Sequence, residues 1–148
     1  MPTCSCCGEE REHVAALQCH PEVAVCRMCV AWLFRSLPGT VHATPILLVP
    51  DLDVAEAFWA AVGQEVERWE GGGYAFVGND GEILHLGEEA DAGGGACYLL
   101  VESVAPWHEG WTASGHEPGP IEDQPWGLRE FTVKDPAGNA IRVGEPLG

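Results

Sequence analysis

The chain has 148 residues, a hydrophobic fraction of 46% and a formal net charge of −16, which suits one globular domain with a small appendage. No segment reaches the roughly 18 uninterrupted apolar residues of a membrane-spanning helix, and the polar, Cys-rich start does not resemble a signal peptide, so we expect a cytoplasmic protein with reduced thiols. Residues 40–148 hold nineteen acidic and four basic residues, a net of −15; this charge disfavours nucleic acid and anionic membranes and attracts cations, with solubility alone as the alternative interpretation.

Six of the seven cysteines lie in the first 29 residues, which predicts a small separate domain over residues 1–39. Two Cys-x-x-Cys pairs, Cys4 with Cys7 and Cys26 with Cys29, are separated by eighteen residues. Each pair can direct two thiolates at one point, and two pairs together complete a tetrahedral zinc site. We therefore predict a structural zinc ion; redox-active or unligated thiols are the alternative.

A helix is predicted over residues 30–37, directly after the second pair, and Pro38-Gly39 ends it. This pattern is typical of a treble-clef or RING-like finger, in which Cys19 or His20 could replace one of the four cysteines. So small a module lacks a sufficient hydrophobic core, so the metal would contribute most of its stability. Its three arginines and absence of lysine favour docking of a protein partner over nucleic-acid binding.

The second domain is predicted over residues 44–148, after a linker at residues 38–43. Its first half reads as a strand at 46–49, a helix at 54–62 capped by Asp51 or Asp53, and strands at 66–69, 74–78 and 82–86. Its second half repeats the order, with a strand at 97–102, a helix at 104–114, a weak strand near 119–122, and strands at 129–134 and 139–143. Two such βαβββ units, each too small to bury its own sheet, are expected to pair around one cleft. Trp59 and Trp111 have the spacing of core residues on the two helices.

The most specific segments of this domain are residues 56–59 on the first helix and residues 123–139. The latter segment contains the Pro125-Trp126-Gly127 turn and the turn at residues 135–138. With the paired βαβββ units, these segments resemble the vicinal oxygen chelate superfamily, which includes glyoxalase I, and most closely the bleomycin resistance proteins. The resemblance covers residues 44–146 and implies an α+β glyoxalase/bleomycin resistance fold. The finger at residues 1–39 is an extension that the usual single-domain resistance protein lacks.

Metalloenzymes of this superfamily take metal ligands from four strands. The resemblance places those four positions at Thr44, His85, Ala96 and Arg142, and His42 could serve the first only through a register shift of two. Of the four, only His85 can bind a divalent metal, and the fixed charge of Arg142 would repel the ion. A glyoxalase-type metalloenzyme is therefore the less favoured interpretation, and His85 could instead be a hydrogen-bonded strand histidine.

Bleomycin resistance proteins are described as dimers that hold the unaltered drug in clefts between subunits, where aromatic rings grip its planar, cationic tail. By this resemblance we expect a non-catalytic homodimer that sequesters a bleomycin-type antibiotic, and the acidic charge suits a cationic ligand. The main alternative is an adaptor protein whose finger docks a partner. Trp126 is the first candidate for ring stacking and Tyr74 the second. The other candidate ligand-binding residues are Trp69, Trp107, His85 and Asp123, with Glu88, Glu89, Asp91 and Glu122 as further acidic candidates.

Overall fold

The computed structural model describes residues 2–11, 14–17, 20–26, 29–30, 43–79 and 81–147. By its internal contacts the chain divides into two compact units, Met1–Ala43 and Thr44–Gly148. The helix predicted over residues 30–37 lies outside the described residues apart from Val30, and the predicted linker lies outside them apart from Ala43.

The first unit is built on a short hairpin, in which β1 (Val14–Leu17) pairs antiparallel with β2 (His20–Cys26). Before the hairpin, the chain turns back on itself after Cys7, and Gly8 adopts a φ of 75°, where a side chain would be strained. Two bonds tie this turn to β2: Ser5 N–H donates to the Ala24 carbonyl at 2.6 Å, and Ala24 N–H donates to Ser5 Oγ at 3.0 Å. The local backbone thus holds the first Cys-x-x-Cys pair beside the strand that ends at the second.

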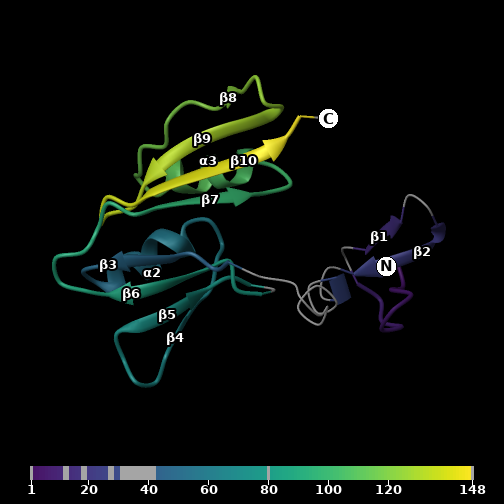
Figure 1. Cartoon of the computed structure of the whole chain (residues 1–148), viewed down its shortest axis with the longest axis horizontal. Helices are drawn as coiled ribbons and strands as arrows, with labels where there is room; N and C mark the ends of the chain where they lie inside the picture. Colours follow the sequence, from purple (N-terminus) through teal and green to yellow (C-terminus); the bar gives the residue numbers. More distant parts are fainter. Residues whose placement is uncertain are drawn as a thin grey trace. The chain divides into compact units, whose positions relative to one another are not determined.

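The second unit consists of two βαβββ halves, which confirms the predicted fold (Figure 1). The first half contains β3 (Ile46–Val49), α2 (Leu52–Ala60), β4 (Val66–Arg68), β5 (Tyr74–Val77) and β6 (Leu84–Glu88). The second half contains β7 (Ala96–Leu100), α3 (Ala105–Ala113), β8 (Glu122–Asp123), β9 (Leu128–Lys134) and β10 (Ala140–Pro146). The strand orders correspond, β3-β6-β5-β4 and β7-β10-β9-β8, and in each sheet the first and last strands of the half run parallel.

Helix α2 begins two residues earlier than predicted because Asp51 caps it. The Asp51 carboxylate accepts hydrogen bonds from Asp53 N–H at 2.8 Å and from Val54 N–H at 3.2 Å, which satisfies backbone donors that the first turn leaves unpaired. Strand β8 is only two residues long and lies at the end of the segment where the sequence pattern is weak.

One face of each sheet packs against the two helices and forms the core. The aromatic centre of this core joins the halves: the ring of Phe58 on α2 stacks on Trp111 of α3 at 5.0 Å, and Trp111 Nε1 donates to the Phe58 carbonyl at 2.9 Å. Trp59 and Trp111 are fully buried, so their predicted core positions are confirmed. Strand residues from both sheets complete the core: Leu47, Val49, Ala75, Val77, Leu84, Leu86, Leu99, Phe131, Val133, Ile141 and Val143.

Side chains alternate between the two faces of a strand, so every second strand residue lies on the opposite face of its sheet. This face is only partly covered. We call it the open face of each half. In the first half it carries Ile46, Leu48, Tyr74, Phe76 and His85. In the second half it carries Ala96, Tyr98, Leu100, Glu130, Thr132 and Arg142. Apolar side chains are accessible on both, since Ile46 is 55% and Leu100 is 65% exposed.

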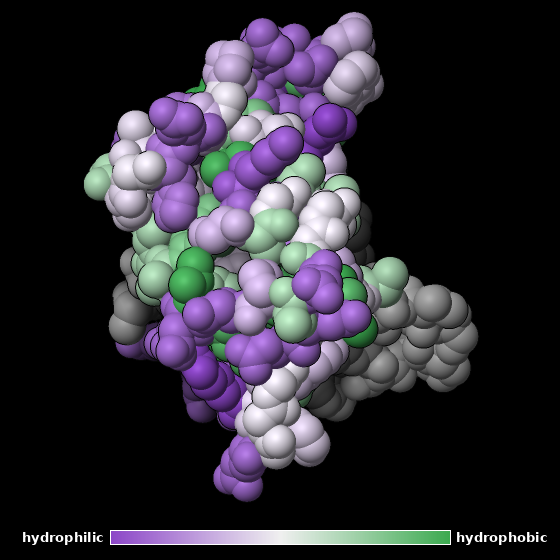
Figure 2. All heavy atoms as spheres, turned by 90° about the vertical axis from the view of Figure 1, so that its left-hand side faces the viewer, coloured by the Kyte–Doolittle hydropathy of each residue, from purple (hydrophilic) through white to green (hydrophobic). Residues whose placement is uncertain are grey.

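Hydrophilic residues cover most of the side of the molecule seen in Figure 2, and hydrophobic residues reach the surface between them in small groups. Within the described ranges, no helix is both long and apolar enough to cross a bilayer.

Candidate functional site

The two halves place corresponding residues at corresponding positions of their open faces. On the first half, His85 of β6 lies opposite Ile46 of the parallel strand β3. On the second half, Arg142 of β10 lies opposite Tyr98 of the parallel strand β7. His85 and Arg142 are therefore equivalent positions of the repeat.

The same correspondence relates Thr44 and Ala96, which precede Ile46 and Tyr98 by two residues. The four positions that the sequence resemblance predicts for metal ligands thus carry a hydroxyl, an imidazole, a methyl group and a guanidinium. This donor set does not fit a divalent ion, which needs three or four ligand atoms. Among the described residues, only the cysteines of the first unit bring three or more Cys, His, Asp or Glu side chains within reach of one ion. His42 lies outside the described residues.

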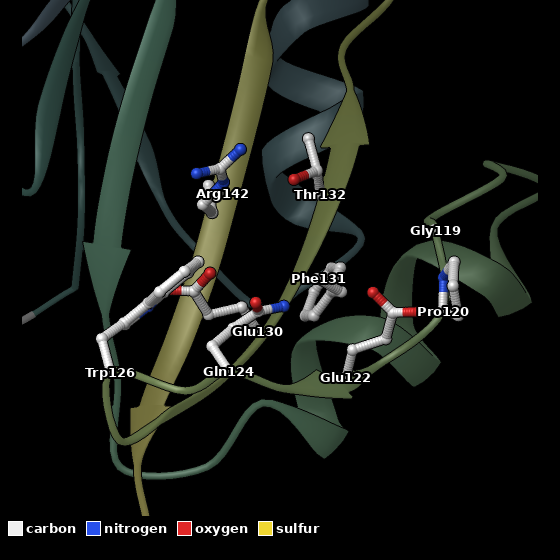
Figure 3. Close-up of a pocket in the computed structure, with 9 residues that line it drawn as sticks. All are labelled: Gly119, Pro120, Glu122, Gln124, Trp126, Glu130, Phe131, Thr132 and Arg142. Carbon is white, nitrogen blue, oxygen red and sulfur yellow. The ribbon is translucent and has the colours of Figure 1, made fainter.

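A pocket of about 270 Å³ opens on the second half (Figure 3). Its floor belongs to β9 and β10, from which Thr132 and Arg142 project, and its walls belong to the turn before β9 and to the segment that leads into β8. The lining residues are Gly119, Pro120, Glu122, Gln124, Trp126, Glu130, Phe131, Thr132 and Arg142.

A buried carboxylate organises one wall of this pocket. Glu130 is only 6% exposed, and its Oε1 accepts hydrogen bonds from the hydroxyl of Tyr98 at 2.5 Å and from Nε1 of Trp126 at 3.0 Å. The hydrogen bond from Tyr98 lowers the pKa of Glu130, and burial raises the pKa of Tyr98 to about 12. Both shifts favour an ionised Glu130 that receives two charge-assisted hydrogen bonds near neutral pH.

Trp126 is fixed by its N–H while its ring stays accessible. The side chain is 61% exposed, and in Figure 3 its ring lies alongside the Glu130 carboxylate at the rim of the pocket. A large exposed ring that is held in place loses little conformational entropy when a ligand stacks on it.

Close packing brings Tyr98 to Glu130. Tyr98 crosses Gly144 of β10, where an added Cβ would lie 2.0 Å from the Tyr98 hydroxyl and 3.2 Å from Cγ of Glu130. A glycine is therefore required at position 144 for the hydroxyl to reach the carboxylate.

Two predicted site residues lie together on the open face of the first half. The Tyr74 hydroxyl is 2.9 Å from Nδ1 of His85, and Nε2 of His85 is 3.1 Å from a carboxylate oxygen of Glu82. Both ring nitrogens of His85 thus have partners within the chain, which supports the interpretation of His85 as a hydrogen-bonded strand histidine. A ligand contact by Tyr74 stays a prediction.

Of the remaining predicted candidates, Glu122 lines the pocket, whereas Trp107, Trp69 and Asp123 do not. Trp107 packs against Trp111 at 5.8 Å, and Trp69 lies in the β4–β5 turn, 57% exposed. Asp123 forms a two-pronged ion pair with Arg129, at 2.6 and 3.1 Å. Whether these residues contact a ligand is untested and stays a prediction.

Sequence reasoning missed Glu130 and gave Arg142 no binding role. The signal available in the sequence was a carboxylate four residues after Trp126, beside Phe131 in a predicted strand. That signal identifies a polar group but not its burial, because burial depends on the long-range pairing of β9 with β10.

The first unit brings the predicted cysteines together. The sulfur atoms of Cys4, Cys7, Cys26 and Cys29 all lie within 4.8 Å of one another, close to the ~3.8 Å sulfur separation of a tetrahedral site with zinc–sulfur bonds of about 2.3 Å. Four cysteines at these separations fit a metal ion. The Cys19 residue and the His20 side chain, the predicted alternates, lie outside the described part.

The thiols of this cluster differ in how readily they ionise. Cys26 N–H donates to Cys4 Sγ at 3.2 Å, and backbone N–H groups, foremost that of Cys26, lower the pKa of Cys4 to about 6. Burial raises the pKa of Cys29, and it also raises the pKa of Cys97 in the second unit, to about 11. Thiolate is the form that binds metal, so backbone hydrogen bonding prepares Cys4 as a ligand.

No family model and no curated protein matches the chain. Solved structures do match. A bleomycin resistance determinant encoded on transposon Tn5 superimposes with a TM-score of 0.64 and 21% identity over 72% of this chain and 98% of that one. The bleomycin-binding protein of Streptomyces verticillus, complexed with copper(II)-bleomycin, superimposes with a TM-score of 0.59 and 27% identity, over 72% of this chain and 97% of that one. A lactoylglutathione lyase from Agrobacterium tumefaciens superimposes with a TM-score of 0.60 and 26% identity, over 74% of this chain and 96% of that one.

These neighbours include both drug-binding proteins and enzymes. The Thr44–Gly148 unit has the glyoxalase/bleomycin resistance fold, its structural neighbours are bleomycin resistance proteins and other members of that superfamily, and the Cys4, Cys7, Cys26 and Cys29 cluster fits a zinc-finger-like extension.

Proposed function

We propose that this protein sequesters a small planar-ring molecule of the bleomycin type without altering it. The observation that carries the proposal is the Trp126 ring, which Glu130 holds by its N–H at the rim of a pocket on the open face. An exposed, immobilised indole can stack on heteroaromatic rings and attract a neighbouring cation. Neighbours with the same fold bind bleomycin.

The absence of catalysis is part of this proposal. Thr44, Ala96 and Arg142 replace three of the four metal ligands that glyoxalase-type chemistry requires. The likeness to a lactoylglutathione lyase therefore supports the shared fold rather than a shared reaction.

Isothermal titration calorimetry with metal-free and copper-bound bleomycin tests the proposal. We expect saturation near one drug per subunit, with affinity that weakens as salt rises because the chain is acidic. Trp126→Ala should weaken binding at least about tenfold, equivalent to ~1.4 kcal/mol. Trp69→Ala is the comparison variant: Trp69 is a further stacking candidate, similarly exposed but outside the pocket lining, so it should bind the drug like the wild type if the ring stacks on Trp126. Unchanged binding by Trp126→Ala, with an intact circular dichroism spectrum, would show that the drug does not stack there.

We further propose that the protein acts as a homodimer. Its open faces leave apolar residues accessible on both halves, among them Ile46, Leu48 and Leu100, and a second copy would remove them from water. Light scattering should give twice the mass of one chain. A monomer at micromolar concentration would contradict this.

We also propose that the four-cysteine cluster holds structural zinc, and that the protein works in the cytoplasm, where thiols stay reduced. All cysteines of the described part are free thiols. Elemental analysis should find one zinc per chain. Cys26→Ser should lose it, whereas Cys97→Ser, outside the cluster, should retain it.

A further inference from the structure

We propose that the pocket of the second half binds the anionic group of a planar aromatic ligand, such as a carboxylate or a sulfonate. Arg142 is the partner of the anion and Trp126 is the surface on which the ring stacks. This inference uses the same pocket and the same stacking residue as the proposed function, and it goes beyond that function because an anionic aromatic ligand differs from a drug with a cationic tail.

Arg142 is a cation in an acidic protein, and no described residue pairs with it. The other arginines of the described ranges are paired: Arg11 with Glu9, Arg68 with Asp53 and Glu56, and Arg129 with Asp123 and Glu145. Arg142 forms no ion pair and no side-chain hydrogen bond with any described residue, yet it lines the pocket. Its guanidinium therefore has its donors free for a group that enters the pocket.

The two carboxylates of the pocket do not neutralise Arg142 at contact distance. Glu130 interacts with Arg142 only through its charge, and Oε1 of Glu130 is already shared by Tyr98 and Trp126. Glu122 lies on the opposite wall, beside Pro120 (Figure 3).

A second donor lies next to Arg142. Thr132 of β9 pairs directly with Arg142 of β10, and both line the pocket. The planar guanidinium fork matches the geometry of a carboxylate or sulfonate, and a neighbouring hydroxyl can add a third hydrogen bond. Both residues stand on paired strands, so the donors are held by the sheet rather than by a loop.

The first half supplies an internal comparison. His85 occupies the position equivalent to Arg142, but Tyr74 and Glu82 occupy both of its ring nitrogens. At this position only the second half has a charged donor without a partner among the described residues, namely Arg142. We therefore place the anion site on the second half.

The test compares 2-naphthoate with the neutral 2-naphthamide by calorimetry on the full chain. The wild type should bind the anion at least about tenfold more tightly, the low end of what a hydrogen bond to a charged group contributes. Arg142→Gln should lose this preference and keep its affinity for the amide. Arg142→Lys should retain a smaller preference, because it keeps the charge but loses the fork. Lys134→Gln is the matched control, because it removes one charge from the same strand pair outside the pocket.

Equal affinity of the wild type for both probes, or a preference that survives in Arg142→Gln, would overturn the inference. If bleomycin binds and neither naphthalene probe does, the anion subsite fails while drug sequestration stands. If the anion preference appears as predicted and bleomycin does not bind, the subsite stands and the drug assignment fails.

Discussion

The two βαβββ halves share the same backbone arrangement, including a glutamate that binds the start of the helix in each half. They differ in which polar groups of their open faces have no hydrogen-bond partner among the described residues. In the first half Glu88, at the end of β6, accepts from Leu52 N–H at the start of α2 at 3.2 Å. In the second half Glu145, near the end of β10, accepts from Val104 N–H at the start of α3 at 2.7 Å. The two glutamates occupy equivalent positions, three residues after His85 and Arg142. Both halves therefore keep the same structural hydrogen bond at the start of the helix, while their open faces differ.

The open faces diverge in which groups remain available. On the first half, Tyr74 and Glu82 each form a hydrogen bond with His85. On the second half, Tyr98 and Trp126 donate to Glu130, the indole ring stays exposed, and Arg142 has no partner among the described residues. The polar groups of the first half therefore bind each other, whereas the second half leaves a cation and an aromatic ring available to a ligand.

The largest loss of stability should follow from removing Asn139, which links the two halves by hydrogen bonds. Asn139 is fully buried, and its Nδ2 donates to the Leu48 carbonyl of β3 at 3.0 Å while its Oδ1 accepts from Gly95 N–H at 2.8 Å. Asn139→Ala leaves both backbone groups without these partners and removes the Asn139 donor from Asp135. We expect a loss of about 3 kcal/mol in the free energy of unfolding, measured by urea denaturation. A loss below about 1 kcal/mol would show that the halves do not depend on this bridge.

Gly144 and Gly87 form the next comparison. An added Cβ at Gly144 would meet the Tyr98 hydroxyl at 2.0 Å, whereas at Gly87 it would meet only a methyl group of Leu48 at 2.9 Å. Gly144→Ala should therefore break the Tyr98–Glu130 bond and cost about 2 kcal/mol of stability, and Gly87→Ala about 1 kcal/mol or less. Equal costs, measured by thermal denaturation, would mean that Tyr98 moves aside freely.

The Tyr98–Glu130 bond also predicts a pH dependence. Because the folded state lowers the pKa of Glu130, the bond stabilises the protein above the unfolded pKa of about 4.3 and this contribution is lost as pH falls through the lower folded value. Tyr98→Phe should cost about 1.5 kcal/mol at pH 7 and progressively less in acid, where Glu130 becomes protonated. Paired urea titrations of wild type and variant at pH 7 and pH 3 measure this. A cost that does not change with pH would indicate lost packing instead of a charge-assisted bond.

The two capping glutamates should give the smallest effects, and unequal ones. Helix α2 has a second cap in Asp51, whereas Val104 gives α3 no side-chain cap. Glu145→Ala should therefore cost about 1 kcal/mol and Glu88→Ala about half of that. Glu89→Ala, next to Glu88 and exposed, is the control with no expected effect. If Glu88→Ala costs more than Glu145→Ala, the proposed division of capping between the helices is wrong.

Much of the fold could be predicted from the sequence because its signals are local. The helix cap at Asp51, the apolar strands and the turn at residues 135–138 each depend on neighbouring residues, and two repeats of the same order indicate the paired halves. The candidate site was only half predictable. Trp126 stands out as a ring between proline and glycine, but the role of Glu130 depends on Tyr98, which lies 32 residues away in sequence. That Arg142 has no partner in the described part of the chain depends on the positions of all nearby acids, which net charge does not reveal.

Ligand binding on the open face of the second half can be located by nuclear magnetic resonance. Backbone and indole N–H chemical shifts of the ¹⁵N-labelled, zinc-loaded protein would be recorded during a titration with metal-free bleomycin. We predict the largest changes at the Trp126 indole N–H and along β8, β9 and β10, with small changes along β3 to β6. Saturable binding with its largest changes at Tyr74, Phe76 and His85 would place the ligand on the first half and contradict this assignment.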